Sequence, residues 1–255
     1  MPDWIFAWVI CGVAIWLLLP ATRWIHKHLQ GLGLLMTNNP RGAVMVYYLA
    51  LFPGVILREV SQWLVAKALK VKVKKFAIWP EKQKGGTIRL ALIDIDDMTG
   101  PVRATLVGIV PVLVGIFFIG LIGLGAFRTQ ELVAGLSTGD VPSAMAGLNT
   151  FFSTPDFWLW TYLIFAIANA MLPEAHDRIS WWLLGGVLVG IVIILLVLDL
   201  GILLQAGLNG PFADLARSMS LALTLSLLID WLVMLLITIT EWVYGRFFNR
   251  EVEYR

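Results

Sequence analysis

The chain has 255 residues, a formal net charge of +2, and 59% hydrophobic against 14% charged residues. Soluble domains carry about a quarter charged residues, so this composition and a mean hydropathy of +0.82 exclude an ordinary soluble protein. The small net charge gives no electrostatic basis for binding nucleic acid. The single cysteine, Cys11, excludes an internal disulfide and is expected to be a small buried side chain. Composition therefore predicts an integral membrane protein that has the lipid bilayer as a partner.

Residues 1–42 predict a membrane anchor followed by an interfacial helix. The apolar run Trp4–Leu19 is closed by Pro20 and is a little shorter than the roughly 20 residues that a span needs. No basic residue precedes it and no small-residue cleavage site follows it, which favours a retained anchor over a signal peptide. Apolar residues then recur at helical spacing over Ala21–Thr37, which predicts an amphipathic helix at the membrane surface; a loop is the alternative. Basic residues and histidines lie between them: Arg23, His26, Lys27 and His28.

Five further apolar segments predict five more spans, over residues 43–69, 101–127, 157–172, 180–205 and 220–244. Residues 128–154 predict a polar connector with short amphipathic pieces, and a polar loop is expected to end at Arg217. The lysine-rich and β-branched stretch at about 70–95 predicts a β-hairpin, or small sheet, at the membrane surface. The predicted fold is an all-α polytopic membrane protein with about six transmembrane helices. Its parts are residues 1–42, a core over 43–178, and two helices with a charged cytoplasmic tail over 179–255.

The distribution of lysine and arginine predicts an orientation, because cytoplasmic loops carry an excess of both. With six spans, 13 of the 19 basic residues fall on the face that holds the hairpin, five fall on the other face, and Arg58 lies inside a span. This bias predicts a plasma (inner) membrane protein with the hairpin and both termini in the cytoplasm. If the first segment does not span, the N-terminus moves to the outer face and nothing else changes.

A degenerate metal-site motif lies in the second apolar segment. The stretch Pro53–Lys67 resembles the core helix of the site-2 protease family of intramembrane metalloproteases. In that family a His-Glu-x-x-His pattern supplies two zinc-binding histidines and a glutamate that activates water. Here the pattern reads Arg58-Glu59-Val60-Ser61-Gln62, so the glutamate persists and both histidine positions are changed.

A second segment carries the same resemblance. Asn169, Pro173 and Asp177 lie in the order of the family's later motif, whose aspartate is the third zinc ligand. The β-rich stretch after the first motif resembles the family's membrane-associated sheet. The resemblance covers about residues 43–178. Counting spans independently predicts that the second and fourth run in the same direction, so that both motifs lie towards the cytoplasmic face.

The residues at the changed positions argue against metal chemistry. Arginine stays protonated and has no lone pair to offer a metal, and Gln62 offers only a carbonyl oxygen. We therefore expect no metal, no cofactor and no catalysis by the family mechanism. A charge inside a membrane needs a partner, so the hypothesis is that Arg58 pairs with Asp177, with Glu59 joining the network and Gln62 satisfying the remaining groups.

Two carboxylates, Asp199 and Asp230, lie in the last two predicted spans. An intramembrane carboxylate is a candidate for a proton or ion path. The alternative is a protonated group, or one that bonds backbone or a hydroxyl such as that of Ser226.

The predicted function is a catalytically inactive, site-2-protease-like membrane protein that binds or scaffolds another membrane protein or transmembrane segment. An active zinc metalloprotease with altered ligands is one alternative. A transporter or proton-conducting subunit is the other.

Overall fold

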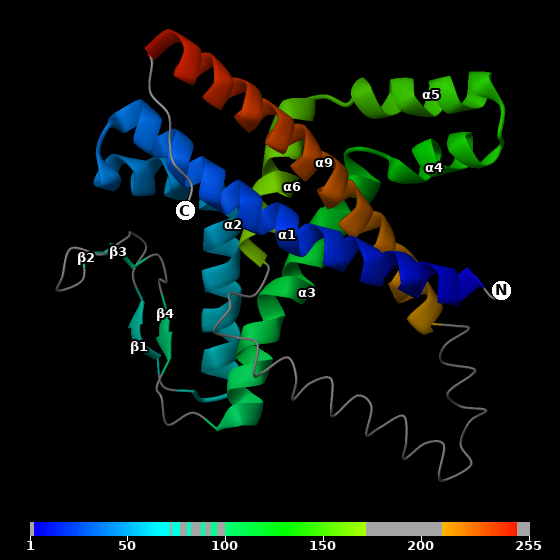
Figure 1. Ribbon diagram of the computed structural model, residues 1–255. Coiled ribbons are helices and arrows are strands. Elements are labelled where there is room, and N and C mark those ends of the chain that lie inside the picture. Colours follow the sequence, from blue (N-terminus) through cyan, green and yellow to red (C-terminus); the bar gives the residue numbers. More distant parts are fainter. Residues whose placement is uncertain are drawn as a thin grey trace.

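A computed structural model describes residues 3–71, 73–76, 81–82, 88–89, 93–95, 100–171 and 211–248. The described chain is predominantly helical (Figure 1). Its helices are α1 (Asp3–Thr37), α2 (Pro40–Ala68), α3 (Pro101–Gly125), α4 (Thr129–Ser137), α5 (Val141–Phe152), α6 (Phe157–Met171) and α9 (Pro211–Phe248).

Four of these helices are long and apolar enough to cross a membrane, over Phe6–Thr37, Pro40–Ala68, Val102–Gly125 and Leu215–Arg246. The hydrocarbon core of a bilayer requires about 20 apolar residues in a helix, and α6, with 15 residues, is shorter. The four helices indicate a multi-pass membrane protein. The predicted fifth span, at 180–205, lies outside the described residues, so the total of six stays a prediction.

The predicted break at Pro20 is wrong, because α1 continues through this proline as one helix of 35 residues. A proline inside a helix removes one backbone hydrogen bond and clashes with the preceding turn. Burial on both sides of the proline offsets that cost: Leu18 and Ala21 are both buried, and Ile25 is fully so. The interfacial position predicted for the second half of α1 stays a prediction.

The last helix also begins earlier than its sequence predicts. Residues up to Arg217 were expected to form a loop, but α9 starts at Pro211. Proline is favoured at the first position of a helix, where its missing N–H needs no partner. Ala216 is buried in the same turn as Arg217 and accepts a bond from the Cys11 thiol at 3.4 Å. Cys11 is itself buried, as predicted.

Helix α2 changes direction along its length. Its first part lies along the end of α1, and its remainder turns away beside α3 (Figure 1). Pro53 lies inside this helix, and proline is a common cause of a sharp kink. Gly54, next to it, is buried. The turn separates the part of α2 that packs on α1 from the part that carries Arg58–Gln62.

The structure describes four short strands between α2 and α3. Strand β1 (Val73–Phe76) pairs antiparallel with β4 (Ile93–Ile95), and β2 (Glu81–Lys82) pairs antiparallel with β3 (Ile88–Arg89). Nested antiparallel pairing of this kind is the order of a hairpin. The residues that join the strands are outside the described ranges, so one continuous hairpin at the membrane surface stays a prediction.

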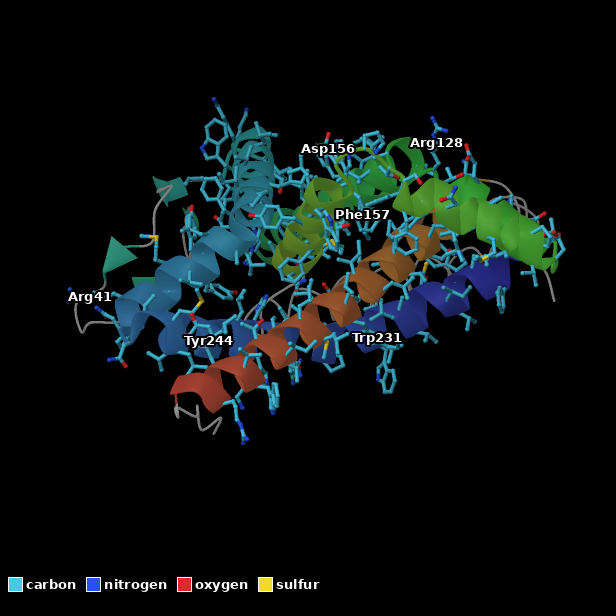
Figure 2. All side chains as sticks on the ribbon, turned by 90° about the horizontal axis from the view of Figure 1, so that it is seen from above. Arg41, Arg128, Asp156, Phe157, Trp231 and Tyr244 are labelled. Carbon is cyan, nitrogen blue, oxygen red and sulfur yellow. The ribbon has the colours of Figure 1, made fainter. Side chains whose placement is uncertain are left out.

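The connector between α3 and α6 contains two helices, α4 and α5, as the amphipathic pieces of residues 128–154 predict. Phe127 stacks on Phe151 with ring centroids 4.7 Å apart, which fixes the connector to the end of α3. Seen from above, Arg41 at the start of α2 and Arg128 before α4 lie towards opposite ends of the molecule (Figure 2). The main apolar core lies between these ends and draws on α1, α2, α3, α6 and α9.

Helices α1 and α9 run in the same direction (Figure 1). Cys11 contacts Ala216 near their starts, and His28 contacts Glu241 near their ends. The predicted topology, with both termini in the cytoplasm, requires the first and last spans to run in opposite directions. The common direction of α1 and α9 does not fit that arrangement if both helices span, and the orientation of the termini stays a prediction.

Candidate functional site

The degenerate motif lies on an unbroken part of α2. The helix continues from Pro40 to Ala68, so Arg58 and Gln62 are one turn apart on the same side. The Arg58 side chain is 20% exposed and that of Glu59 is 4% exposed, and Arg58 Nε lies 4.0 Å from Glu59 Oε1. Ser61 donates its hydroxyl proton to the Arg58 carbonyl at 2.7 Å. The cation Arg58 therefore occupies the position where the resemblance implies a zinc-binding histidine, and the buried carboxylate Glu59 occupies the position of the glutamate that activates water.

Helices α2 and α6 are in close contact. Gly54 is so close to α6 that a Cβ atom there would overlap the Ala166 carbonyl and lie 2.8 Å from Ala170 Cβ. One turn earlier, the Tyr162 hydroxyl donates to the Leu49 carbonyl at 3.1 Å. Residue numbers rise together along this contact, so α2 and α6 run in the same direction, as the count of spans predicts.

The stripe of α2 that faces α6 leads directly to the motif. Gly54, Arg58 and Gln62 are spaced four residues apart, which places them in one row along the helix. Since Gly54 is level with Ala166 and Ala170, Arg58, one turn further along α2, comes at or past the last described residue of α6, Met171. Pro173 and Asp177 lie outside the described residues, so the ion pair between Arg58 and Asp177 stays a prediction.

Asn169, the first residue of the second motif, bonds a different carboxyl group. Its side-chain amide donates to Asp230 Oδ1 at 2.7 Å and to the Phe165 carbonyl at 3.0 Å. Asn169 is 1% exposed and Asp230 is fully buried. Among the described residues, Asn169 Oδ1 and Asp230 Oδ2 have no hydrogen-bond partner. Asp230 does not take its bond from Ser226, whose hydroxyl donates to the Ala222 carbonyl at 2.9 Å. Asp199 lies outside the described residues.

His26 joins the same junction from α1. Its Nε2 lies 3.1 Å from the Asn169 carbonyl oxygen, and its ring meets that of Tyr47 edge-on at 5.5 Å. Asn169 is thus the point where side chains from α1 and α9 meet the end of α6. The sequence indicates Asn169 and Asp230 separately, but the two residues are 61 positions apart and nothing in the sequence signals their pairing. The sequence does not predict the contact of His26 with Asn169 either, because the helical spacing around His26 predicts a position at the membrane surface.

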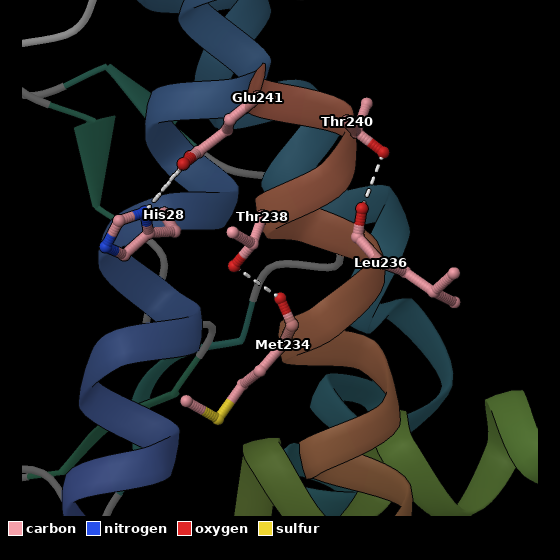
Figure 3. A network of polar contacts seen from close by, with 6 residues as sticks. All are labelled: His28, Met234, Leu236, Thr238, Thr240 and Glu241. Atoms are coloured by element: carbon pink, nitrogen blue, oxygen red, sulfur yellow. Dashed lines mark hydrogen bonds and ion pairs between the residues drawn. The ribbon is translucent and has the colours of Figure 1, made fainter. Parts of the chain in front are cut away.

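A second polar contact ties α1 to α9. His28 Nδ1 lies 2.9 Å from Glu241 Oε2 and 3.1 Å from Oε1 (Figure 3). The His28 ring also stacks on Trp24 with centroids 3.8 Å apart. Thr238 and Thr240 lie close to this contact, but both bond carbonyls of their own helix (Figure 3). The His28–Glu241 contact is therefore a polar connection between the helices at this end.

Within the described ranges, no group of three or more His, Cys, Asp and Glu side chains could hold a metal ion. Comparisons of the chain with protein-family models, with curated proteins and with solved structures gave no match.

Proposed function

We propose that this chain is a catalytically inactive, site-2-protease-like membrane protein that binds a transmembrane segment of a partner. The observation that supports this most is the placement of the two motifs. Arg58, Glu59 and Gln62 lie on the stretch of α2 that continues from its contact with α6, and α6 carries Asn169 in the same direction. An active relative would use two such neighbouring helices to hold its metal.

The chemistry of the site supports binding over catalysis. Arg58 cannot ligate a metal, and its guanidinium fills space next to Glu59, where a metal-bound water would need to reach the carboxylate. Arg58 and Asp177 then replace the metal as the link between the two motifs. The exposed apolar residues of α2, among them Val60 and Leu64, provide a surface for a partner helix.

Restoring the ligands tests the resemblance itself. The double variant Arg58→His with Gln62→His should bind one zinc ion per chain, because the two imidazoles would lie one helical turn apart. Adding Asp177→Asn should remove that zinc. The parent chain should purify without stoichiometric zinc. A folded double variant that binds none contradicts the resemblance, and zinc in the parent that is lost on Asp177→Asn would favour a metalloenzyme with altered ligands.

Photo-crosslinking tests the binding role. A photoreactive amino acid at Leu64, which is 55% exposed on α2, should give one discrete adduct in native membranes. The peptide recovered from it should be an apolar segment of about 20 residues. The matched control is Leu236, which is 48% exposed on α9. Equal adducts from both positions, or none from Leu64, contradict the proposal.

The proposed topology has five spans over residues 43–244, with the hairpin and the C-terminus in the cytoplasm and the N-terminus on the outer face; a sixth span over the first segment would place both termini inside. The common direction of α1 and α9 does not fit a first span that runs opposite to the last one. Cys11 is the only cysteine, so single cysteines can be introduced into a Cys11→Ala chain. Asp3→Cys and Ser137→Cys should react with an impermeant maleimide from outside, whereas Lys84→Cys and Arg255→Cys should not. Protection of Asp3→Cys would restore the topology with both termini inside.

A proton or cation path is the second candidate, favoured by the buried Asn169–Asp230 pair. One oxygen of each side chain has no hydrogen-bond partner among the described residues, which leaves two acceptors for a proton or a hydrated cation. Liposomes that contain the chain should then show a flux that Asp230→Asn and Asp199→Asn abolish. Ser226→Ala, which removes a hydroxyl bonded within α9, is the control. No flux in the parent chain, or an unchanged flux in the variants, removes this candidate.

A further inference from the structure

Helices α4 and α5 form a helical hairpin, over Thr129–Phe152, in which the two helices run in opposite directions. A Cβ atom at Gly135 would overlap the Ser143 carbonyl oxygen, and one at Gly147 would lie 3.1 Å from Leu132 Cα. Residue numbers fall along α5 as they rise along α4 in these contacts, so the helices are antiparallel. The two glycines mark the sides on which α4 and α5 pack together.

The large exposed apolar residues of both helices lie on one side of the helical hairpin. At about 100° per residue, each is rotated by between about 100° and 160° from the packing glycine of its own helix, in the same sense. In an antiparallel pair, rotation in the same sense from the contact brings both sets to the same side. Exposed polar residues, among them Gln130, Glu131 and Ser153, lie on the opposite side. The apolar face consists of Val133, Leu136, Val141, Met145, Leu148 and Phe152, which are 36% to 73% exposed.

The base of the helical hairpin is fixed to the bundle. The Phe151 ring stacks on Phe127 and meets Phe157 with centroids 5.8 Å apart. The Thr154 hydroxyl donates to the Ala126 carbonyl at 3.3 Å. Beyond this base, α4 and α5 pack chiefly on each other and project sideways from the bundle (Figure 1). The apolar face therefore has a fixed orientation, and no helix of the described chain covers it.

The position of the base indicates what covers the apolar face. Helix α3 is long and apolar enough to cross a membrane and ends at Gly125, shortly before α4 begins. Leu121 and Leu124 in its last turns are 51% and 43% exposed, so the apolar surface of α3 continues up to the helical hairpin. Lipid is therefore the neighbour expected on both surfaces. Residues 128–154 contain one basic and two acidic residues, so apolar burial rather than charge would hold the helical hairpin in the membrane.

We infer that the helical hairpin inserts its apolar face among the acyl chains of the bilayer beside the end of α3, with its polar side towards water. A contiguous apolar face of this kind is unfavourable in water, and its transfer into lipid is favourable. The connector would then be part of the membrane-bound structure rather than a loop above it. This interaction is independent of the proposed function, because the helical hairpin contains no residue of either motif.

Two matched pairs of single cysteines, in the full Cys11→Ala chain, test the orientation. Leu136→Cys is paired with Ala134→Cys on α4, and Leu148→Cys is paired with Ala146→Cys on α5. The members of each pair are two residues apart and therefore lie about 160° apart around the helix. Both alanines are exposed, so a fluorophore at any of the four positions lies at the surface of the chain.

The labelled chains are reconstituted in phosphatidylcholine liposomes. Phosphatidylcholine brominated on its acyl chains should quench the labels at the two leucine positions roughly threefold more than those at the alanine positions, and aqueous iodide should show the reverse preference. Adding anionic lipid should leave both patterns unchanged. Val141→Glu, which places a charge on the apolar face, should reduce lipid quenching at Leu148→Cys, whereas Gln130→Glu should not.

Three results would overturn the inference. Equal quenching within the pairs would mean that the helical hairpin has no lipid-facing side. Stronger quenching by iodide at the leucine positions would place the apolar face in water. Labels at the leucine positions that neither quencher reaches would mean that protein, such as a second copy of the chain, covers the face.

Discussion

The α2–α6 and α1–α9 pairs both run in a common direction, but different contacts join them. Helices α2 and α6 meet mainly through Gly54, whose missing side chain lets it approach the Ala166 backbone, and one exposed bond from the Tyr162 hydroxyl to the Leu49 carbonyl adds to this contact. Helices α1 and α9 are linked by polar contacts near both ends, from Cys11 to Ala216 and from His28 to Glu241. The first pair thus depends on shape, which membrane helices use widely. The second adds individual bonds made by the Cys11 and His28 side chains to its apolar packing.

This difference predicts opposite sensitivities. A shape contact fails when volume is added, because two packed backbones cannot both move aside. A contact made by individual side chains fails gradually, one bond at a time. The Asn169–Asp230 hydrogen bond connects the two helix pairs, because Asn169 belongs to α6 and Asp230 belongs to α9. We expect its loss to have an intermediate effect.

The largest effect is expected at Gly54. Gly54→Ala places a methyl group in the Ala166 carbonyl and should destabilise the chain by about 3 kcal/mol, the upper end for overpacking. Gly108→Ala is the control, because its methyl group meets no atom within 4 Å and alanine is the better helix former by roughly 1 kcal/mol. Unfolding in mixed micelles measures both. Equal stability of the two variants would show that α2 and α6 are not in close contact.

Asp230 should give the next largest effect. Asp230→Ala leaves the buried Asn169 amide without its carboxyl acceptor and should cost about 2 kcal/mol, the usual cost of an unsatisfied buried group. Asp230→Asn keeps a side-chain oxygen at the same place and should cost less than half as much. The same unfolding assay separates the two variants. Equal losses would mean that the charge, rather than the hydrogen bond, joins α6 to α9.

Much of the fold follows from the sequence because its signals are local. Apolar runs of the length of a membrane set the positions of α2, α3 and the central part of α9. The connector helices follow from amphipathic spacing, and the common direction of α2 and α6 follows from counting spans. Pro20 misled the prediction because the cost of a helical proline is local, whereas the packing of Leu18 and Ile25 that offsets it is not.

The candidate site was less predictable, because its contacts join residues that are far apart in the sequence. The residue types at Arg58 and Gln62 were enough to argue against metal binding, because the ligand atoms that a side chain offers depend on its chemical type alone. The pairing of Asn169 with Asp230 and the approach of His26 depend on how α1 and α9 cross the end of α6. The direction of α1 relative to α9 is also set by these long-range contacts, and composition carries no information on it.

A smaller effect is expected at His28. Both side chains of the His28–Glu241 contact are 17% exposed, so Glu241→Gln should cost about 1 kcal/mol, as for a well-aligned pair near a surface. Thr240→Val removes a neighbouring hydroxyl that bonds only the Leu236 carbonyl and should have little effect on α1 (Figure 3). A double-mutant cycle with His28→Ala measures the coupling. A coupling near zero would mean that the His28–Glu241 contact contributes little to the link between α1 and α9.

The smallest effect on stability is expected at Asp140 in the connector, which belongs to neither helix pair. Asp140 precedes α5, and its Oδ2 accepts a bond from the Ser143 amide at 2.9 Å. Bonds from the Thr138 side chain and from Ser143 lower the pKa of Asp140 from 3.8 to about 2. Because the folded pKa is depressed, the stabilisation is complete above the unfolded value and disappears as the pH falls through about 2. Asp140→Ala should fray the first turn of α5 at neutral pH.

The amide proton shift of Ser143 follows this cap directly. In the parent chain it should move as the pH is lowered from about 4 towards 2, as the carboxylate is protonated. Asp140→Asn is the matched control, since asparagine also caps helices but does not titrate. Its Ser143 shift should stay constant, and its α1–α9 and α2–α6 contacts should be unchanged. A shift that moves equally in both chains would place the titrating group elsewhere, and a loss of stability in either helix pair would mean that the connector helps to hold the bundle together.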